Sequence, residues 1–146
     1  MEKKILLASD HAAYPLKNHL KYWLEKQSYE VTDLGTDSED STNYAIYGHK
    51  LGDLMDSEPG YIGIALCGSG NGMNMSVGKH NSIRNALCWN SEIAQLARLH
   101  NDANVCVMPG RFITQVEAEE IVEIFLNTDF EGGRHQERVN MIPLKK

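Results

Sequence analysis

Short apolar runs recur along the chain, separated by longer stretches of mixed character. The runs cover residues 5–8, 29–32, 61–66, 85–88 and 105–108. Nearly continuous apolar runs of this length are typical of strands that are covered on both faces, as in a parallel sheet. The pattern therefore predicts five buried strands.

The stretches between the runs carry apolar side chains at helical spacing. Leu16, Leu20 and Leu24 mark one face of a predicted helix, and Pro15 suits its first turn. Thr114, with a glutamate three residues later, predicts a capping box at the start of another helix. Strands that alternate with helices imply right-handed βαβ units, so the sequence predicts a doubly wound α/β sandwich.

Composition narrows the class of protein. The chain has 146 residues, of which 42% are apolar and 23% charged, so we expect one globular domain over residues 1–146. No stretch approaches the roughly 20 apolar residues of a membrane span, and no signal peptide is recognisable. Three cysteines without a CxxC pair argue against a disulfide framework or a zinc site and favour a reducing compartment. We therefore expect a cytoplasmic protein without a membrane partner.

Charge and topology indicate where a ligand binds. The net charge of -6 disfavours nucleic-acid binding, so an anionic ligand would need a local group of basic residues. Ligands of open α/β sheets bind beyond the carboxyl ends of the strands. The segments that follow the predicted strands are 9–11, 34–36, 67–72, 89–90 and 109–111. We expect their carboxylate, imidazole, thiol, hydroxyl and guanidinium groups to gather at one edge of the sheet.

A glycine-rich loop follows the third predicted strand. Gly68, Gly70 and Gly72 allow a tight turn whose amide groups face an anion at a helix N-terminus, and we favour this interpretation over a flexible turn. The spacing G-x-G-x-G differs from a dinucleotide-binding fingerprint, and no GK[ST] follows as in a P-loop. The loop thus predicts an anion site without identifying the anion.

Cys67 directly precedes the loop. Cys88 and Cys106 fall inside predicted strands and are interpreted as core residues. Amide groups ahead of Cys67 would favour a thiolate, but from position alone a reactive thiol and a buried core thiol are equally supported.

Other polar groups suit acid–base or phosphate chemistry. If Asp10, His11 and His100 converge with the thiol, they can move protons near neutral pH. The remaining histidines, at 19, 49, 80 and 135, are interpreted as surface or capping residues. Arg134 and Arg138 would share one helix face and could grip a phosphate, although spacing alone favours a solvated face.

Four ordered motifs identify a family resemblance that runs along nearly the whole chain. They are SDHAA at 9–13, CGSGNG at 67–72, RLHNDANV at 98–105 and EGGRHQERV at 131–139. With them, the chain resembles the ribose-5-phosphate isomerase B family, which also contains the subunits of galactose-6-phosphate isomerase. The resemblance implies a Rossmann-like three-layer sandwich with a five-stranded parallel sheet, no metal or other cofactor, and a homodimer or homotetramer with sites at the subunit interface.

The resemblance also implies a reaction and assigns roles. The substrate would be a phosphorylated sugar, ribose 5-phosphate, converted to ribulose 5-phosphate through a cis-enediolate. Cys67 would move the proton between C2 and C1, and His100 would help to open the sugar ring. Asp10 would bind sugar oxygens, with Ser69 hydrogen-bonding nearby. The implied substrate-binding residues are His11, Tyr44, Gly68, Gly70, Asn71, Gly72, Asn101, Arg111, Arg134 and Arg138. Of these, His11, Arg134 and Arg138 would bind phosphate, joined by Arg111 of the neighbouring subunit.

Met73 stands where some members of the family carry a glutamate base, which leaves Cys67 as the candidate base. Two departures from the family pattern keep alternatives open. The chain reads Asn43-Tyr44-Ala45, where the family has aspartate before the tyrosine and proline after it. The alanine-rich helix usual in the family differs at 74–79. A six-carbon substrate, galactose 6-phosphate or allose 6-phosphate, is the first alternative. A non-catalytic sugar-phosphate-binding subunit is the second, and the full set of Cys67, His100 and Asp10 argues against it.

Overall fold

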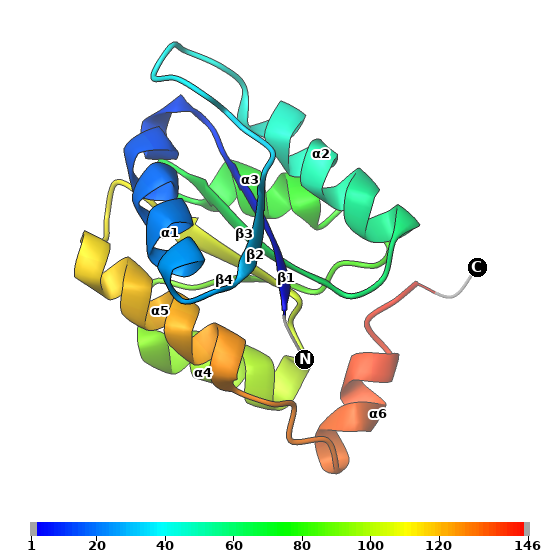
Figure 1. Ribbon diagram of the computed structural model, residues 1–146. Coiled ribbons are helices and arrows are strands. Elements are labelled where there is room, and N and C mark those ends of the chain that lie inside the picture. Colours follow the sequence, from blue (N-terminus) through cyan, green and yellow to red (C-terminus); the bar gives the residue numbers. More distant parts are fainter. Residues whose placement is uncertain (1–2, 145–146) are drawn as a thin grey trace.

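The computed structural model describes residues 3–144, and its centre is a five-stranded parallel sheet (Figure 1). The strands are β1 (Lys4–Ser9), β2 (Glu30–Asp33), β3 (Tyr61–Cys67), β4 (Asn85–Leu87) and β5 (Val105–Pro109). They lie in the order β2-β1-β3-β5-β4, and every neighbouring pair is parallel. The predicted five-stranded α/β sheet is thus confirmed.

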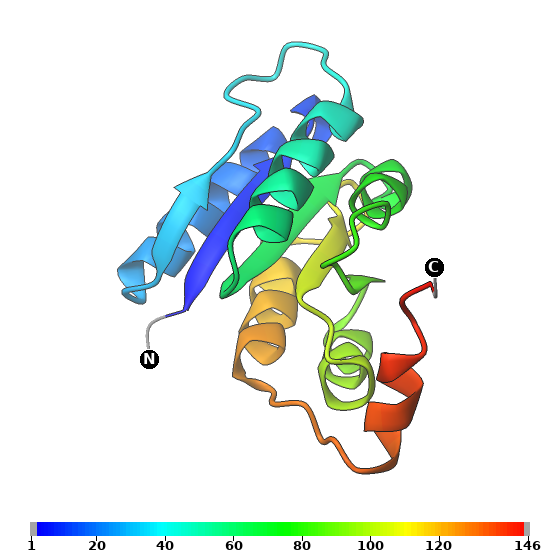
Figure 2. The same cartoon turned by 90° about the vertical axis from the view of Figure 1, so that its right-hand side faces the viewer.

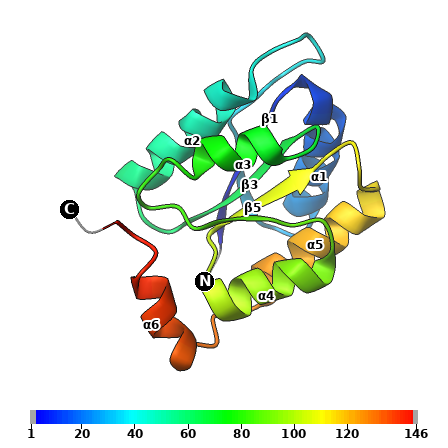
Figure 3. The same ribbon diagram turned by 180° about the vertical axis from the view of Figure 1, so that it is seen from behind.

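Helices cover both faces of the sheet. They are η1 (His11–Ala13), α1 (Tyr14–Lys26), α2 (Tyr44–Ser57), α3 (Asn71–Val77), α4 (Ser91–Asn101), α5 (Gln115–Asn127) and α6 (Arg134–Asn140). One face packs against α1, α4 and α5, and the other packs against α2 and α3. The short helix α6 stands outside both layers, beside α4 (Figures 2 and 3). Across residues 3–144 the helices are too short or too polar to span a membrane.

The strands read as continuous apolar runs because both of their faces are buried. In β1, Ile5 and Leu7 join the core under α1 and α5, whereas Leu6 and Ala8 join the core under α2 and α3. All four side chains are at most 1% exposed. A parallel sheet with two covered faces therefore removes the polar alternation that a half-exposed strand would show.

Local sequence signals fix the helix ends. The Thr114 hydroxyl accepts a hydrogen bond from the Glu117 amide at 3.1 Å, and the Glu117 carboxylate accepts one from the Thr114 amide at 2.9 Å. This confirms the predicted capping box. Seven of the ten strand ends differ from the prediction, each by one residue, and two of them concern cysteines. Cys67 is the last residue of β3 because it still pairs with Pro109, and Cys88 lies one residue beyond β4.

The order of the strands creates a topological switch point. From β1 the chain continues to β2 on one side, and β3 then pairs with β1 on the other side. The connections leave the carboxyl ends of β1 and β3 in opposite directions, which opens a crevice between them. Asp10 follows β1 and Cys67 ends β3, so the topology brings these two residues to that crevice.

Candidate active site

Asp10 and His11 are fixed where β1 leads into η1. Asp10 is 6% exposed, and its Oδ1 accepts hydrogen bonds from the amides of Ala12 at 3.1 Å and Ala13 at 3.4 Å. The Nδ1 of His11 accepts a hydrogen bond from the Thr42 amide at 3.1 Å. A neutral ring that accepts at Nδ1 carries its proton on Nε2, so His11 offers a donor at its free nitrogen.

Cys67 lies at the carboxyl end of β3, 4% exposed, in the core that also contains Met73. Its carbonyl oxygen accepts a hydrogen bond from the Gly110 amide at 2.9 Å, and the next carbonyl, of Gly68, accepts one from the Arg111 amide at 3.0 Å. These bonds tie the segment after β5 to the start of the glycine-rich loop. The thiol is therefore held by backbone on two neighbouring strands.

The loop after Cys67 requires glycine at its centre. Gly70 caps α3 with a φ of 80°, and a Cβ atom there would lie 2.6 Å from the Leu87 side chain. Other residues rarely adopt this backbone conformation and would also collide with Leu87. The Asn71 amide donates to the Ser69 hydroxyl at 3.3 Å, so Ser69 helps to shape the turn.

Tyr44 covers the loop from the start of α2. A Cβ atom on Gly72 would lie 2.3 Å from the Tyr44 ring, so only glycine lets the ring approach this closely. Asn43 caps α2, and its Oδ1 accepts a hydrogen bond from the Ala45 amide at 2.9 Å. Proline has no amide hydrogen to donate, so the unusual Asn43 and Ala45 form a cap that the family's proline would lack.

Arg111 joins this edge from the end of β5. A Cβ atom on Gly68 of the same chain would lie 3.4 Å from both Cδ and Nη1 of Arg111. One chain therefore brings most of the predicted residues to the carboxyl edge of its sheet, and we call this group the thiol edge. Its members are Asp10, His11, Tyr44, Cys67, Gly68, Ser69, Gly70, Asn71, Gly72 and Arg111.

His100 and Asn101 lie at the opposite edge. They end α4, which runs back across the sheet, and β5 begins four residues after the helix, at Val105. Cys67 pairs with Pro109 at the other end of β5. From its first to its last residue β5 spans about 13 Å. The expectation that His100 converges with Cys67 at one edge is therefore wrong within a single chain, because a crossover helix returns its last residues to the amino edge.

Arg134 and Arg138 lie beside His100. The predicted helix is present as α6, with both arginines exposed. The His100 and His135 rings stack with centroids 4.3 Å apart, and the Glu131 amide donates to the Leu99 carbonyl at 3.1 Å. The family resemblance groups these arginines with His11 and takes Arg111 from the neighbouring subunit. In this chain Arg111 lies with His11, whereas both arginines of α6 lie at the far edge.

A network of side chains fixes the end of α4. Asp102 has a φ of 48° and ends the helix in the left-handed conformation. Its carboxylate pairs with Arg98 at 3.0 Å and with Arg84 at 3.3 Å. The Asn104 side chain accepts from the Arg84 amide and donates to the Ser82 carbonyl, both at 2.8 Å. Much of the motif at 98–105 therefore serves to position His100.

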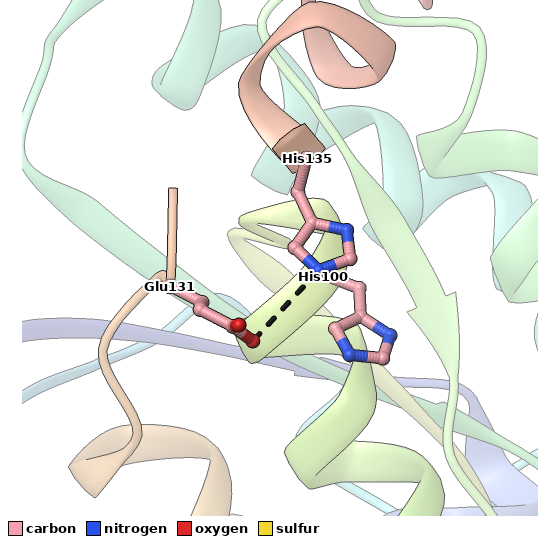
Figure 4. A group of neighbouring side chains, drawn as sticks. All are labelled: His100, Glu131 and His135. Atoms are coloured by element: carbon pink, nitrogen blue, oxygen red, sulfur yellow. Dashed lines mark ion pairs between the residues drawn. The ribbon is translucent and has the colours of Figure 1, made fainter. Parts of the chain in front are cut away.

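The sequence interpretation missed a cluster of His100, Glu131 and His135 at this end (Figure 4). His135 was expected at the surface but is only 5% exposed, because α6 packs it against α4. Burial lowers the pKa of His135, and the neighbouring His100, Arg134 and Arg138 lower it further. The carboxylate of Glu131 has the opposite effect and raises it. The separation of four residues between Glu131 and His135 was the only sign of the cluster in the sequence.

Comparison with known proteins gives consistent matches over nearly the whole chain. The profile of a family described as Ribose/Galactose Isomerase matches residues 5–142. Ribose-5-phosphate isomerase B of Escherichia coli K12 is 36% identical over 140 residues, which cover 96% of this chain and 94% of that protein.

Two solved structures share the fold. A ribose 5-phosphate isomerase from Thermotoga maritima superposes with a TM-score of 0.94 at 44% identity, covering 98% of this chain and 99% of the other. Ribose-5-phosphate isomerase B from Mycoplasma genitalium, with bound ribulose-5-phosphate, gives a TM-score of 0.92 at 35% identity. That match covers 97% of this chain and 95% of the Mycoplasma chain.

Proposed function

Because the chain belongs to the ribose/galactose isomerase family and is thus a sugar-phosphate isomerase, we propose that it interconverts ribose 5-phosphate and ribulose 5-phosphate. The observation that carries this proposal is the thiol edge, where Asp10 and Cys67 flank the switch point and the glycine-rich loop follows the thiol. Proton transfer between adjacent carbons needs one base and a site for the developing negative charge, and this edge offers both.

In the proposed reaction Cys67 acts as a thiolate on the open-chain sugar. It removes the proton from C2, the bonding pair forms the C1–C2 double bond, and the negative charge moves to O1 of a cis-enediolate. The proton then returns to C1, while the hydroxyl proton of O2 passes to O1 and the C2 carbonyl forms. Met73 is buried and has no group that accepts a proton, which supports Cys67 as the base in this chain.

The other residues of the thiol edge would bind the intermediate and the phosphate. We assign the amide groups around Gly70 to Gly72 to the enediolate oxygen, where donors fixed in advance favour developing charge. Asp10 would hold sugar hydroxyls. The free Nε2–H of His11 and the guanidinium of Arg111 would bind phosphate by charge-assisted hydrogen bonds.

The proposal includes a second copy of the chain. His100, which would open the sugar ring, lies at the opposite edge of the sheet together with Asn101, Arg134 and Arg138. A homodimer, alone or within a tetramer, would complete each thiol edge with these residues of the partner. The exposed apolar side chains after α6 support this arrangement, since Met141 is 72% and Leu144 90% exposed. A cytoplasmic location stays a prediction.

A six-carbon sugar phosphate, galactose 6-phosphate or allose 6-phosphate, is the second candidate substrate. The feature that favours it is the altered cap at Asn43 and Ala45, because Tyr44 covers the loop from this helix start and is 41% exposed. A shifted ring would change the length of sugar that fits.

Ketose formation by the purified chain, measured separately with ribose 5-phosphate, galactose 6-phosphate and allose 6-phosphate, tests these proposals. We expect the highest kcat/KM with ribose 5-phosphate. A higher value with a six-carbon substrate would replace the proposed substrate. Binding of a sugar phosphate without ketose formation from any of the three would favour the non-catalytic subunit.

A further inference from the structure

Three side chains that could each bind a metal ion meet between α4 and α6. A nitrogen of His100, a nitrogen of His135 and a carboxylate oxygen of Glu131 all lie within 4.8 Å of one another. Figure 4 shows the carboxylate of Glu131, from the segment before α6, directed at the pair of stacked rings. The cluster lies at the opposite edge of the sheet from Cys67.

One buried nitrogen in the cluster has no hydrogen-bond partner among residues 3–144. His135 is buried, with its side chain 6% exposed, and its Nε2 makes no hydrogen bond within residues 3–144. The nearest carboxylate oxygen, of Glu131, is 3.8 Å away, beyond hydrogen-bond distance. A buried polar atom without a partner is costly, and few such atoms persist in folded proteins. The unpartnered nitrogen therefore indicates a ligand that the chain itself does not supply.

Charged groups surround the cluster. Burial and the charges of His100, Arg134 and Arg138 lower the pKa of His135, whereas the charge of Glu131 raises it. Metal ions bind imidazole in its neutral form. Glu131 supplies one negative charge and, being 57% exposed, has room to adjust. The two arginines disfavour a cation but favour an anion as a further ligand.

We propose that His100, Glu131 and His135 form a binding site for a divalent transition-metal ion of the zinc class. Two imidazoles and one carboxylate are a ligand set of zinc sites with an open fourth position, whereas magnesium and calcium prefer oxygen ligands. A metal binds an imidazole nitrogen in the plane of the ring at about 2.1 Å, so the two rings, now stacked 17° from parallel, must rotate toward a common point and Glu131 must move inward. Water or a phosphate oxygen would fill the fourth position.

Occupation of the site would inhibit isomerisation. A metal bound to His100 withdraws it from ring opening, so zinc should slow turnover of ring-closed substrate and a chelator should restore it. This consequence rests on the proposed function, whereas metal binding does not. With no metal added, EDTA should leave activity unchanged.

Isothermal titration of the full-length, chelator-treated protein with Zn²⁺ tests the binding directly. We expect one ion per chain, with at least tenfold weaker binding in Glu131→Gln and in His135→Gln. Glu131→Gln changes an exposed side chain, so it tests the site even if His135→Gln folds poorly. Glu137→Gln, which removes an exposed carboxylate of α6 outside the cluster, is the matched control and should bind zinc normally.

Two further controls separate this site from other zinc ligands. His49 and His80 form a second histidine pair, 2.8 Å apart, so His49→Gln should leave the titration unchanged. Co²⁺ in place of Zn²⁺ should show d–d absorption without a thiolate charge-transfer band, which excludes Cys67. Unchanged zinc binding in Glu131→Gln and His135→Gln, loss of binding in His49→Gln, or a thiolate band would each overturn the proposal. If zinc binds as expected but no sugar phosphate is isomerised, only the proposed function fails.

Discussion

The thiol edge and the α4–α6 end hold their functional groups by different means. At the thiol edge the turns of the backbone hold the functional groups in place, since Asp10 caps η1 and Gly70 turns the chain into α3. At the α4–α6 end, ion pairs between side chains hold them, those of Asp102 with Arg84 and Arg98. Conformation therefore fixes the first region, and a polar network fixes the second.

The two regions also differ in exposure. Cys67 and Asp10 are 4% and 6% exposed, whereas Arg134 and Arg138 stand exposed on a helix outside the main layers. A buried thiol and a buried carboxylate suit proton transfer, which requires fixed distances. Exposed arginines can contact a substrate or a second copy of the chain. Each chain therefore carries the two parts of the proposed site at opposite edges of one sheet.

Replacement of Cys67 should have the largest effect. Cys67→Ala removes the proposed base, so kcat should fall by ~10²–10⁴-fold while binding of sugar phosphate is kept. Cys88→Ala, which removes a buried thiol from the core on the other face of the sheet, is the control and should retain turnover. Steady-state kinetics and calorimetric binding measure both quantities. Turnover of Cys67→Ala close to that of the unaltered protein would remove the thiol from the mechanism.

Mixed oligomers test whether the two regions work together across a subunit interface. Cys67→Ala and His100→Asn, each nearly inactive with ring-closed substrate, would be unfolded and refolded together in equal amounts. In a two-fold dimer, one site of each hybrid carries both defects and the other carries none, so about a quarter of the activity should return.

Arg111 provides the contrasting mixture. It lies beside Gly68 of its own chain, on the same edge as Cys67, so Cys67→Ala mixed with Arg111→Ala should leave one defect in every site. Activity should stay at the level of the parents. A return to about a quarter in this mixture would show that Arg111 serves the partner's site, as the family resemblance implies.

Gly70→Ala should test the claim that backbone conformation fixes the thiol edge. Alanine at a φ of 80° costs about 1–2 kcal/mol, and overlap with Leu87 adds roughly 1–3 kcal/mol. Gly60→Ala is the matched control, since Gly60 has a φ of 95° but no neighbour within 4 Å. Chemical denaturation should show the larger loss of unfolding free energy for Gly70→Ala. Equal losses would mean that close packing at Gly70 contributes nothing.

Asp102 should show the smallest effect and test the network at the other end. Asp102→Asn keeps a residue that tolerates the left-handed conformation and loses two partly exposed ion pairs, which costs below ~1 kcal/mol. Asp102→Ala loses the same ion pairs and also places alanine in the left-handed conformation, which alanine disfavours, so its total loss of unfolding free energy should be about 1–2 kcal/mol. Thermal unfolding compares the two variants. Equal losses of unfolding free energy in the two variants would mean that charge and not conformation holds the end of α4.

The strands and the chemistry of the thiol edge were visible in the sequence for a physical reason. A buried parallel strand must be apolar along its length, and the residues that follow it lie at one known edge. Asp10, Cys67 and Arg111 each follow or end such a strand, so their common location could be predicted. The Thr114 capping box was equally visible, because it depends on two residues three apart.

The α4–α6 end was harder to predict because it depends on packing between helices. The position of His100 follows from the direction of α4, and a crossover helix carries its last residues away from the carboxyl edge. His135 resembles a surface residue in its polar surroundings, yet α6 buries it against His100. The spacing of apolar residues within a seven-residue helix cannot show which neighbouring element that helix packs against.

The attachment of α6 has a consequence for the dynamics of the chain. Only His135 and Val139 of this seven-residue helix are buried, and a helix this short is marginal without packing. Its amides should therefore exchange with solvent deuterium through local opening, while the amides of β1 and β3 exchange only with global unfolding. Each opening would separate His135 from His100 and leave the thiol edge intact. Protection of α6 that rises with protein concentration would show that self-association closes this helix.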